Sequence, residues 1–349
     1  MRPMLKPALR RLWRDHNTLQ LGLDPDRAII LAGVDRASAR LVHALDGTRD
    51  RQGVLATASE LGIDASRATS LLDLLAREGA LDDAATDRRP LFTLGREERD
   101  RLQPDLASLS LMRRTPDGGI ATLAQRRAAT VAAHGAGRVG ASVVNLLAAA
   151  GVGRVLVADP TPARLADVCP AGFGATEVGA RRDDAARRRM RRLFPATRAS
   201  QSTSQRHPDL VILAPDDALD LSLRDGLVRA GVPHLYATVR ETTGIVGPLV
   251  IPGSSSCLRC HDLYRRDRDP AWPTIAAQLA TRDTTATACD TVLATTVAAH
   301  AALQALAFLD GDQPSTIDGT LEISLPDGGL RRRSWMPHPC CGCSWSQEE

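Results

Sequence analysis

A glycine-rich turn contains the first residues whose types and spacing suggest chemistry. Residues 135–140 read GAGRVG, the pattern G-x-G-x-x-G, and a short run of small apolar residues precedes them. In such a turn the first glycine permits a sharp reversal, the second lets the backbone approach a phosphate, and the third lets helix and strand pack closely. The following helix then presents free N–H groups and a positive dipole end to an anion. Gly135, Gly137 and Gly140 are therefore candidate nucleotide-binding residues.

The segments around this turn fit a single strand–turn–helix–strand unit. From Thr130 to Asp159 the chain contains a strand-like apolar run, the turn, a helical run and a second strand-like run that ends in a carboxylate. Asp159 lies 19 residues after Gly140, where such units place an acid that holds a ribose hydroxyl. The pattern predicts a nucleotide-binding βαβ unit; the alternative is a glycine turn beside an empty crevice. Alone, it does not separate hydride transfer from ATP binding, but no catalytic pair for hydride transfer is evident.

Charged residues further along the chain add candidates for the same site. The apolar run 210–214 is followed by Pro215, Asp216 and Asp217, and acids after a central strand lie in the ligand crevice. Such acids suit Mg²⁺ bound to ATP phosphates, although capping of a following helix is an equal alternative. The segment 178–195 is rich in arginine and predicts a helix whose charged side chains mostly face water. One or two arginines at its N-terminal end are placed to reach a phosphate.

Two cysteine-rich segments form a second candidate site. One reads CLRC at 257–260 and the other reads HPCCGC at 338–343. A C-x-x-C segment presents two thiolates to one metal, and a second pair completes a tetrahedral site. The second pair is either Cys340 with Cys343 or Cys341 with Cys343, so the candidate zinc ligands are Cys257, Cys260, Cys340, Cys341 and Cys343. We expect structural Zn²⁺ rather than a redox pair, because four or five thiols converge.

Composition narrows the range of functions. The 349 residues include 44 Lys and Arg against 41 Asp and Glu, a net charge of +3 that indicates no nucleic-acid partner. No apolar segment resembling a signal peptide lies near Met1, and seven cysteines without one suggest a reducing compartment, so we expect a cytoplasmic protein. The uncharged run 291–309 is long enough to span a membrane, but its threonines, histidine and glutamine favour a buried helix. We therefore expect no membrane partner.

The order of patterns predicts two domains of different class. Residues 1–84 contain two strand-like runs followed by three helical patterns, which predicts a small winged-helix-like α+β domain. Its candidate recognition helix lacks a basic stripe, which favours binding of a protein or peptide over binding of DNA. The charged, proline-containing stretch 85–119 is expected to be a linker. Residues 120–349 alternate strand-like and helical runs, which predicts a Rossmann-like, doubly wound α/β domain that carries the cysteine site.

The N-terminal region resembles the leader-peptide-recognition domain of ribosomal peptide natural-product pathways. The similarity lies in the runs RPMLKPALRRLW, TLQLGLD, AIILAGVD and LLDLLAREGALDD. This domain resembles the small pyrroloquinoline-quinone (PqqD-like) biosynthesis chaperone. The resemblance implies that a precursor peptide adds as a strand to the edge of the sheet and rests against a helix.

The remainder, from about residue 120, resembles the ThiF/MoeB/HesA family, the bacterial relatives of ubiquitin-activating enzymes. The glycine turn followed by NLLAAAGVGRVLVADP, the later V-G-x-x-R, the paired aspartates and the cysteine pairs carry this similarity. The resemblance implies an ATP-binding domain that adenylates the C-terminal carboxylate of a peptide or small carrier protein. It also implies a homodimer, Mg²⁺ as cofactor and structural zinc.

Carried over by motif, the three glycines would hold phosphates, Asp159 the ribose and Asp216 Mg²⁺, while Arg182 would neutralise phosphate charge. The family's N-L-x-R-Q segment is replaced by ARLADVCPAGFG, in which Arg164 is the nearest substitute for the missing arginine. This departure leaves a second hypothesis open. A degenerate scaffold would bind a precursor leader and present it to a YcaO-type cyclodehydratase that performs the ATP chemistry.

Overall fold

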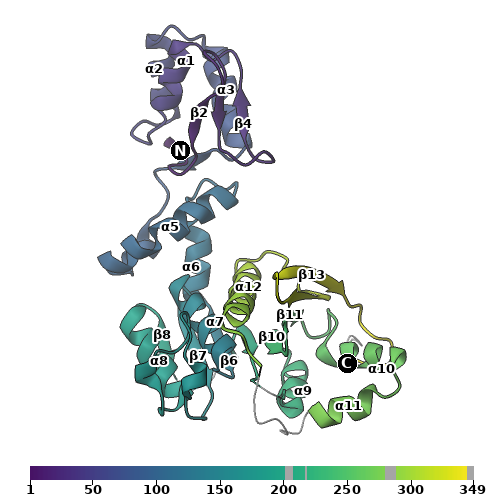
Figure 1. Cartoon of the computed structure of the whole chain (residues 1–349). Helices are drawn as coiled ribbons and strands as arrows, with labels where there is room; N and C mark the ends of the chain where they lie inside the picture. Colours follow the sequence, from purple (N-terminus) through teal and green to yellow (C-terminus); the bar gives the residue numbers. More distant parts are fainter. Residues whose placement is uncertain (201–206, 217, 280–287, 344–349) are drawn as a thin grey trace. The chain divides into compact units, whose positions relative to one another are not determined.

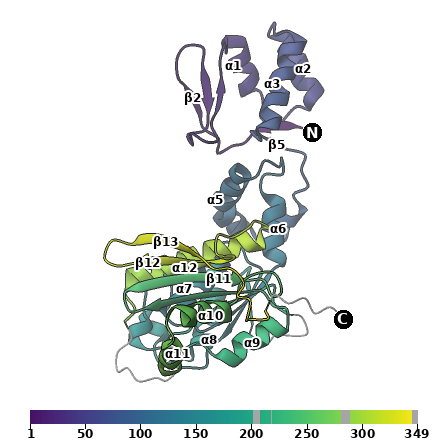
Figure 2. The ribbon, with the colours of Figure 1, turned by 90° about the vertical axis from the view of Figure 1, so that its right-hand side faces the viewer.

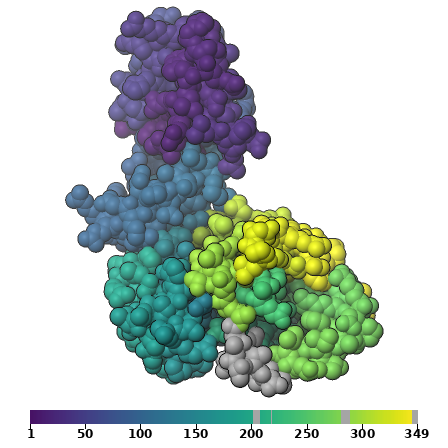
Figure 3. All heavy atoms as spheres, viewed as in Figure 1, coloured from purple at the N-terminus to yellow at the C-terminus, as the bar shows by residue number. Residues whose placement is uncertain are grey.

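The computed structural model describes residues 1–200, 207–216, 218–279 and 288–343. The chain divides into two compact units, Met1–Ala124 and Gln125–Glu349. Figures 1 and 3 show the units as ribbons and as space-filling atoms, and each unit is described by itself.

The first unit combines short strands with helices. Its strands are β1 (Pro3–Leu5), β2 (Arg11–Trp13), β3 (Leu19–Leu21), β4 (Ile29–Leu31) and β5 (Leu81–Asp83). Its helices are α1 (Arg36–His43), α2 (Arg51–Glu60), α3 (Ala65–Arg77), α4 (Arg89–Phe92) and α5 (Arg96–Met112), and α6 (Ile120–Ala128) continues into the second unit. Strands β2, β3 and β4 form an antiparallel sheet in that order, and β1 pairs with β5.

Aspartates define where the first three helices begin. Asp35, Asp50 and Asp64 each accept a hydrogen bond from a backbone N–H in the first turn of α1, α2 and α3 respectively. Such caps satisfy N–H groups that have no partner inside the helix. Apolar side chains from the helices and from the sheet then share one buried core, which includes Leu21 and Leu72. The winged-helix-like α+β class is confirmed in this unit.

Two features of the first unit differ from the sequence-based expectation. Strands β1 and β2 were not anticipated, because each has only three residues and lies in a segment rich in arginine and proline. The stretch expected to be a linker, 85–119, contains α4 and the 17-residue helix α5 and lies within the first compact unit. Leu102 and Leu109 of α5 are buried, so this helix packs against other residues and is not a solvent-exposed linker.

The second unit is built on one eight-stranded sheet. Its strands are β6 (Thr130–His134), β7 (Arg154–Ala158), β8 (Arg198–Ser200), β9 (Leu210–Leu213), β10 (His234–Arg240), β11 (Thr243–Val250), β12 (Gly319–Ser324) and β13 (Gly329–Ser334). Its helices are α7 (Arg138–Ala149), α8 (Arg182–Leu193), α9 (Leu221–Arg229), α10 (Leu258–Arg268), α11 (Trp272–Leu279) and α12 (Thr291–Leu309).

The order of the strands reverses beside the glycine turn. The sheet reads β13-β12-β11-β10-β9-β6-β7-β8, parallel from β8 to β10 and antiparallel from β10 to β13. Figure 2 labels its antiparallel strands β11, β12 and β13. From the central strand β6 the chain first moves outward to β7 and β8, and then returns to β9 on the other side. Ligands of doubly wound sheets bind where the strand order reverses in this way. The predicted doubly wound class is confirmed; strands β12 and β13 were not anticipated.

Helices cover both faces of this sheet. Helices α7 and α12 pack against each other, and α12 also contacts β10 and β11. Helix α12 is the one helix among the described residues that is long and apolar enough to cross a membrane by length and composition. Its buried side chains, which include Leu293, Val297 and Ala301, instead belong to the same core as β6 and β7. On the opposite face, Leu223 and Leu227 of α9 pack against the sheet.

Candidate functional site

The glycine turn is held so tightly that side chains are excluded. Gly135 has φ +91°, a conformation that side chains rarely adopt, and an added Cβ would lie 2.1 Å from the carbonyl oxygen of Ala214. A Cβ on Gly140 would lie 2.1 Å from the carbonyl oxygen of Gly135. At Gly137, the nearest group is a carboxylate oxygen of Asp216, 1.7 Å from the position of a Cβ. The turn therefore brings its backbone against the end of β9 and against Asp216.

Helix α7 begins at this turn with its N–H groups uncapped. Its N-cap is Gly137, which has no side chain to accept from the first turn. Arg138, the first residue of the helix, directs its guanidinium toward the carbonyl oxygens of Ala166 and Cys289 and the hydroxyl of Thr291. These contacts tie α7 to the 3₁₀ turn that contains Ala166 and to the start of α12. The first-turn N–H groups are thus available to an anion.

Asp159 follows β7 and faces the glycine turn. Its carboxylate accepts hydrogen bonds from the backbone N–H of Ala136 at 2.8 Å and from the N–H of Thr161 at 3.1 Å. The side chain is 7% exposed. The structure thus places Asp159 beside the turn, at the end of the strand next to β6.

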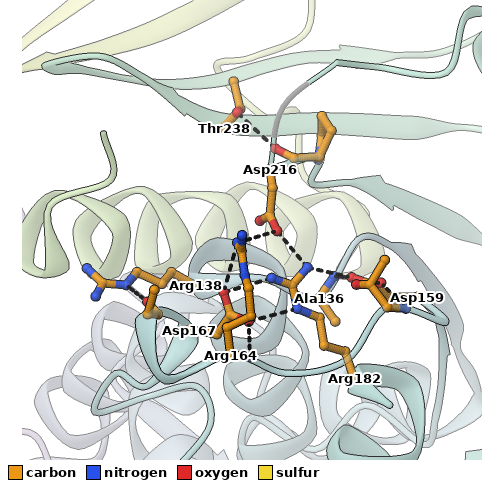
Figure 4. A network of polar contacts seen from close by, with 11 residues as sticks. Ala136, Arg138, Asp159, Arg164, Asp167, Arg182, Asp216 and Thr238 are labelled. Atoms are coloured by element: carbon orange, nitrogen blue, oxygen red, sulfur yellow. Dashed lines mark hydrogen bonds and ion pairs between the residues drawn. The ribbon is translucent and has the colours of Figure 1, made fainter. Parts of the chain in front are cut away.

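Arg182 connects three carboxylates at the centre of the site (Figure 4). Its guanidinium lies 3.2 Å from Asp159, 2.7 Å from Asp167 and 2.6 Å from Asp216, and its side chain is 5% exposed. Burial works against the charge of this guanidinium, but Asp216, Asp167 and Asp159 outweigh burial and raise the pKa of Arg182. Two of the sequence-predicted site residues, Asp159 and Asp216, are therefore brought together by the third, Arg182.

Asp167 is a residue that sequence reasoning missed. It ends a short 3₁₀ turn, Leu165–Asp167, in the segment where the family motif is absent. Its carboxylate accepts hydrogen bonds from Arg182 and from the backbone N–H of Arg164, and its side chain is 4% exposed. The guanidinium of Arg164 lies 3.5 Å from Asp167 and 4.0 Å from Asp216, and Arg164 is 53% exposed. The signal available in the sequence was an acid three residues after Arg164.

Asp216 retains access to solvent, with 24% of its side chain exposed. Burial raises its pKa; the Arg182 charge offsets part of this rise, whereas Asp167 and Asp159 add to it. The pKa of an acid beside an arginine usually falls, but here three acids share one buried guanidinium and repel one another. Asp216 is consequently the acid of the group that is most accessible to a ligand. Asp217 lies outside the described residues.

Four of the five candidate cysteines form a compact cluster. The Sγ atoms of Cys257, Cys260, Cys341 and Cys343 all lie within 4.8 Å of one another. The Sγ of Cys257 is 3.8 Å from that of Cys260 and 3.5 Å from that of Cys341, and Cys260 and Cys343 are 3.3 Å apart. Four thiolates around Zn²⁺ at about 2.3 Å would be separated by about 3.8 Å, so the donor set fits zinc. Cys340, the fifth candidate, is exposed and lies outside this group.

The local fold prepares this cluster for a metal ion. Cys257 caps α10, Cys260 lies in the first turn of this helix, and the other two cysteines follow β13. The side chain of Cys257 and the backbone N–H of His338 both bond to the Cys260 sulfur and lower its pKa, whereas the hydrogen bond to Cys260 and burial raise the pKa of Cys257, and burial raises that of Cys343. The His338 ring contacts Asp267 at 2.8 Å, which fixes the segment before Cys341. The cluster could therefore bind zinc as a thiolate site.

Comparisons with known proteins identify the family and the fold of this chain. The ThiF family model matches residues 110–344. The E. coli MccB structure with ATP covers 98% of this chain and 99% of its own, with 14% identity and a TM-score of 0.75. The microcin C7 biosynthetic enzyme MccB in complex with N-formylated MccA covers 99% of this chain and 100% of its own, at 14% identity and a TM-score of 0.74.

A PaaA structure is also similar, at 16% identity and a TM-score of 0.69 over 95% of this chain and 99% of its own. At these identities the likeness shows a shared fold. Among curated proteins, none matches the sequence. The family model, however, spans about two thirds of the chain and includes the glycine turn, the Arg182 network and the cysteine cluster. The chain belongs to the ThiF family.

Proposed function

We propose that this protein is an ATP-dependent adenylyltransferase that activates the C-terminal carboxylate of a peptide in ribosomal peptide natural-product biosynthesis. The observation that carries the proposal is the buried contact of Arg182 with Asp159, Asp167 and Asp216, next to the uncapped start of α7. The MccB structures with ATP and with MccA support the same class of reaction and a peptide as substrate. We expect the protein to act in the cytoplasm.

Different residues of the site would bind different parts of Mg²⁺·ATP. The N–H groups at the start of α7 would receive phosphate oxygens, and Asp159 would bind the ribose. Asp216 would hold Mg²⁺, because it is the acid of the group with most exposure to solvent. When bound, Mg²⁺·ATP supplies an electrophilic α-phosphate and a pyrophosphate leaving group. Arg182 and Arg164 would stabilise the negative charge that spreads over the phosphates as the carboxylate attacks.

A Mg²⁺ ion held by Asp216 would compete with Arg182 for this carboxylate. In the described state the two side chains are 2.6 Å apart. Arg182 would still be held by Asp159 and Asp167, so its guanidinium need not leave the site when Asp216 turns to the metal. Arg182 would then remain close to the phosphates of a bound ATP.

A groove in the first unit supports recognition of a peptide. It has a volume of about 850 Å³ and is lined by Ile29 and Ile30 of β4 and by Leu74 of α3. Strand β4 is the outermost strand of its sheet, and Ile30 is 52% exposed. An extended leader peptide would pair with β4 and place its apolar side chains against α3.

The experiment is exchange of labelled pyrophosphate into ATP, measured with short peptides encoded beside the gene. We expect exchange that depends on a peptide with a free C-terminal carboxylate and is lost when this carboxylate is amidated. Asp216→Asn should lose exchange, whereas Asp225→Asn, at an exposed acid of α9, should retain it. Absence of exchange with every peptide, combined with tight leader binding, would exclude the adenylation proposal.

That outcome would instead favour the scaffold hypothesis. Two observations favour it: the replaced N-L-x-R-Q segment, and a groove beside β4 that suits a leader peptide. In this case the protein would present the peptide to a YcaO-type cyclodehydratase. Addition of such an enzyme with leader-bearing and leaderless substrates would then reveal stimulation that needs the leader.

We also propose a homodimer and structural zinc. The outer face of α12 exposes Val292 by 72% and Leu303 by 61%, beside a groove of about 420 Å³ that includes Pro170. A second copy of the chain would cover this apolar face. Sedimentation of the wild type and of Leu303→Glu would test it: a monomer in both would exclude the dimer.

A further inference from the structure

The first unit contains a second groove, on the opposite edge of its small sheet. This groove has a volume of about 890 Å³ and runs between β2 and α1. Its floor includes buried apolar side chains from the sheet and from the helices, Leu5, Leu19, Val42 and Leu45. Trp13, at one side, is 53% exposed and lies opposite Leu19 in the register of β2 and β3. A large aromatic ring thus faces solvent above an apolar floor.

Strand β2 offers unpaired backbone groups along this groove. The bonds from Gly22 N–H to Arg10 O and from Arg14 N–H to Thr18 O fix which residues of β2 pair with β3. Because hydrogen-bonded positions alternate in an antiparallel pair, the N–H and C=O groups of Arg11 and Trp13 point away from β3. Strand β2 is the outermost strand on this side of the sheet. Two donors and two acceptors are therefore positioned for another extended chain.

The rim of the groove is strongly basic. Four arginines, Arg11, Arg36, Arg40 and Arg49, and His43 line it, against the single acid Asp46. Arg49 lies 3.8 Å from Asp46, and Arg11 contacts the His43 ring. Among the described residues, no carboxylate lies within ion-pair distance of Arg36 or Arg40, which lie one helical turn apart on α1. This pair of guanidinium groups is available to an anionic partner.

We propose that this groove binds an acidic peptide segment as an added strand on β2. The backbone of the segment pairs with Arg11 and Trp13, its carboxylates contact Arg36 and Arg40, and its apolar side chains lie against Trp13 and the floor. An extended peptide is favoured over a nucleic acid because β2 supplies backbone donors and acceptors at strand spacing. The site is separate from the β4 groove and does not depend on the adenylation chemistry.

The test uses the full-length protein and a fluorescein-labelled nine-residue peptide of alternating glutamate and valine, followed by fluorescence anisotropy. We expect saturable binding that weakens with salt, and no binding of the same peptide with lysine in place of glutamate. In the double variant Arg36→Glu with Arg40→Glu, two attractive contacts become repulsive. Its affinity for the acidic peptide should therefore fall by about tenfold or more. Trp13→Ala should weaken binding several-fold.

Matched controls separate this site from general charge attraction. Arg88→Glu with Arg96→Glu changes the net charge equally, at exposed residues of the same unit that do not line the groove, and should leave affinity unchanged. Two further peptides carry methyl groups on alternate backbone nitrogens, one on the odd-numbered and one on the even-numbered residues. The peptide whose methyl groups replace the N–H donors that face β2 should bind weakly. Circular dichroism and unfolding curves confirm that each variant is folded.

Three results would overturn the proposal. Equal weakening in the two charge-reversal pairs would show that only net charge matters. Tighter binding of a single-stranded oligonucleotide through Arg36 and Arg40 would assign the groove to nucleic acid. A monomer–dimer equilibrium that disappears in the Arg36→Glu, Arg40→Glu variant would assign it to a second copy of this chain.

Discussion

Asp167 holds Arg182 through a hydrogen bond and an ion pair at once. One carboxylate oxygen accepts from Nε at 3.0 Å and the other contacts Nη2 at 2.7 Å, and both side chains are at most 5% exposed. This paired geometry fixes the plane of the guanidinium, whereas Asp159 and Asp216 both contact only Nη1. Asp167 therefore positions the arginine that the proposed chemistry needs, although it occupies no position in the family's motifs.

Substitution of Asp167→Asn should impair activity more than stability. The asparagine N–H₂ group would face a guanidinium N–H, so Arg182 would lose one fixed contact but keep Asp159 and Asp216. We expect peptide-dependent pyrophosphate exchange to fall about 100-fold, because small displacements of a catalytic group have large effects. The free energy of unfolding should fall by about 1–3 kcal/mol.

The control for this substitution is Asp225→Asn, at an exposed acid whose ion pair should contribute little. Asp167→Glu, which retains a charge, should recover part of the lost exchange. Unchanged exchange in Asp167→Asn would contradict the positioning role.

Asp216 should give stability an unusual dependence on pH. Burial raises its pKa above the ordinary value of 3.8. Between 3.8 and the raised value, the folded protein holds a proton that the unfolded chain has released. The free energy of unfolding contributed by this group therefore falls as pH rises through that window.

Denaturant unfolding of wild type and Asp216→Asn over a pH series tests this sign. The stability of the wild type relative to the variant should decrease as pH increases above 3.8. Mg²⁺-dependent ATP binding should show the opposite trend, because the metal needs the deprotonated carboxylate. Parallel pH profiles for the two proteins would argue against the raised pKa.

The cysteine cluster predicts that the adjacent residues Cys340 and Cys341 differ in their effect on zinc binding. Cys341→Ser removes a member of the four-thiol group, whereas Cys340→Ser changes an exposed thiol outside it. Metal analysis should find close to one zinc per chain in the wild type and in Cys340→Ser, and much less in Cys341→Ser. Chelation should lower the melting temperature of the first two proteins, since metal binding is coupled to folding. Loss of zinc from Cys340→Ser would assign the fourth ligand differently.

Substitution of a glycine by alanine should change the free energy of unfolding in opposite directions in two helices. A Cβ on Gly140 would lie 2.1 Å from a backbone oxygen, whereas nothing lies within 4 Å of the corresponding position at Gly226. We expect Gly140→Ala to lower the free energy of unfolding by about 3 kcal/mol through overpacking. Gly226→Ala, within α9, should raise it by up to about 1 kcal/mol through helix propensity. Urea unfolding of both variants measures this contrast, and a stable Gly140→Ala protein would exclude the close packing.

Elements with long periodic patterns were predictable from the sequence. The G-x-G-x-x-G turn identified β6, α7 and β7, and the arginine-rich segment 178–195 contains α8. Asp64 precedes an apolar helical pattern and caps α3, in keeping with the preference of aspartate for the N-cap position. Strands β1, β2, β8, β12 and β13 were not predicted. Strand β1 is stabilised by pairing with the distant β5, whereas β2 and β13 pair with nearby strands but contain arginine, so each carries little local signal of a strand.

The site was predictable in its parts but not in its contacts. Asp159, Arg182 and Asp216 could be identified because each follows a recognisable strand or motif. Asp167 could not, since its role depends on a 3₁₀ turn that folds it back onto Arg182. The choice between Cys340 and Cys341 likewise depends on the path of the chain after β13, which spacing alone leaves open.

The contact of Arg182 with three acids affects how active variants of this protein can be recognised. An internal cation satisfies the acids of this site without any ligand, so the folded state does not depend on nucleotide to relieve their repulsion. Heat resistance and expression level are then poor indicators of whether a natural variant is active. Evolution could inactivate such a site and leave a well-folded protein. Only a direct assay of turnover would distinguish the active protein from the inactive one.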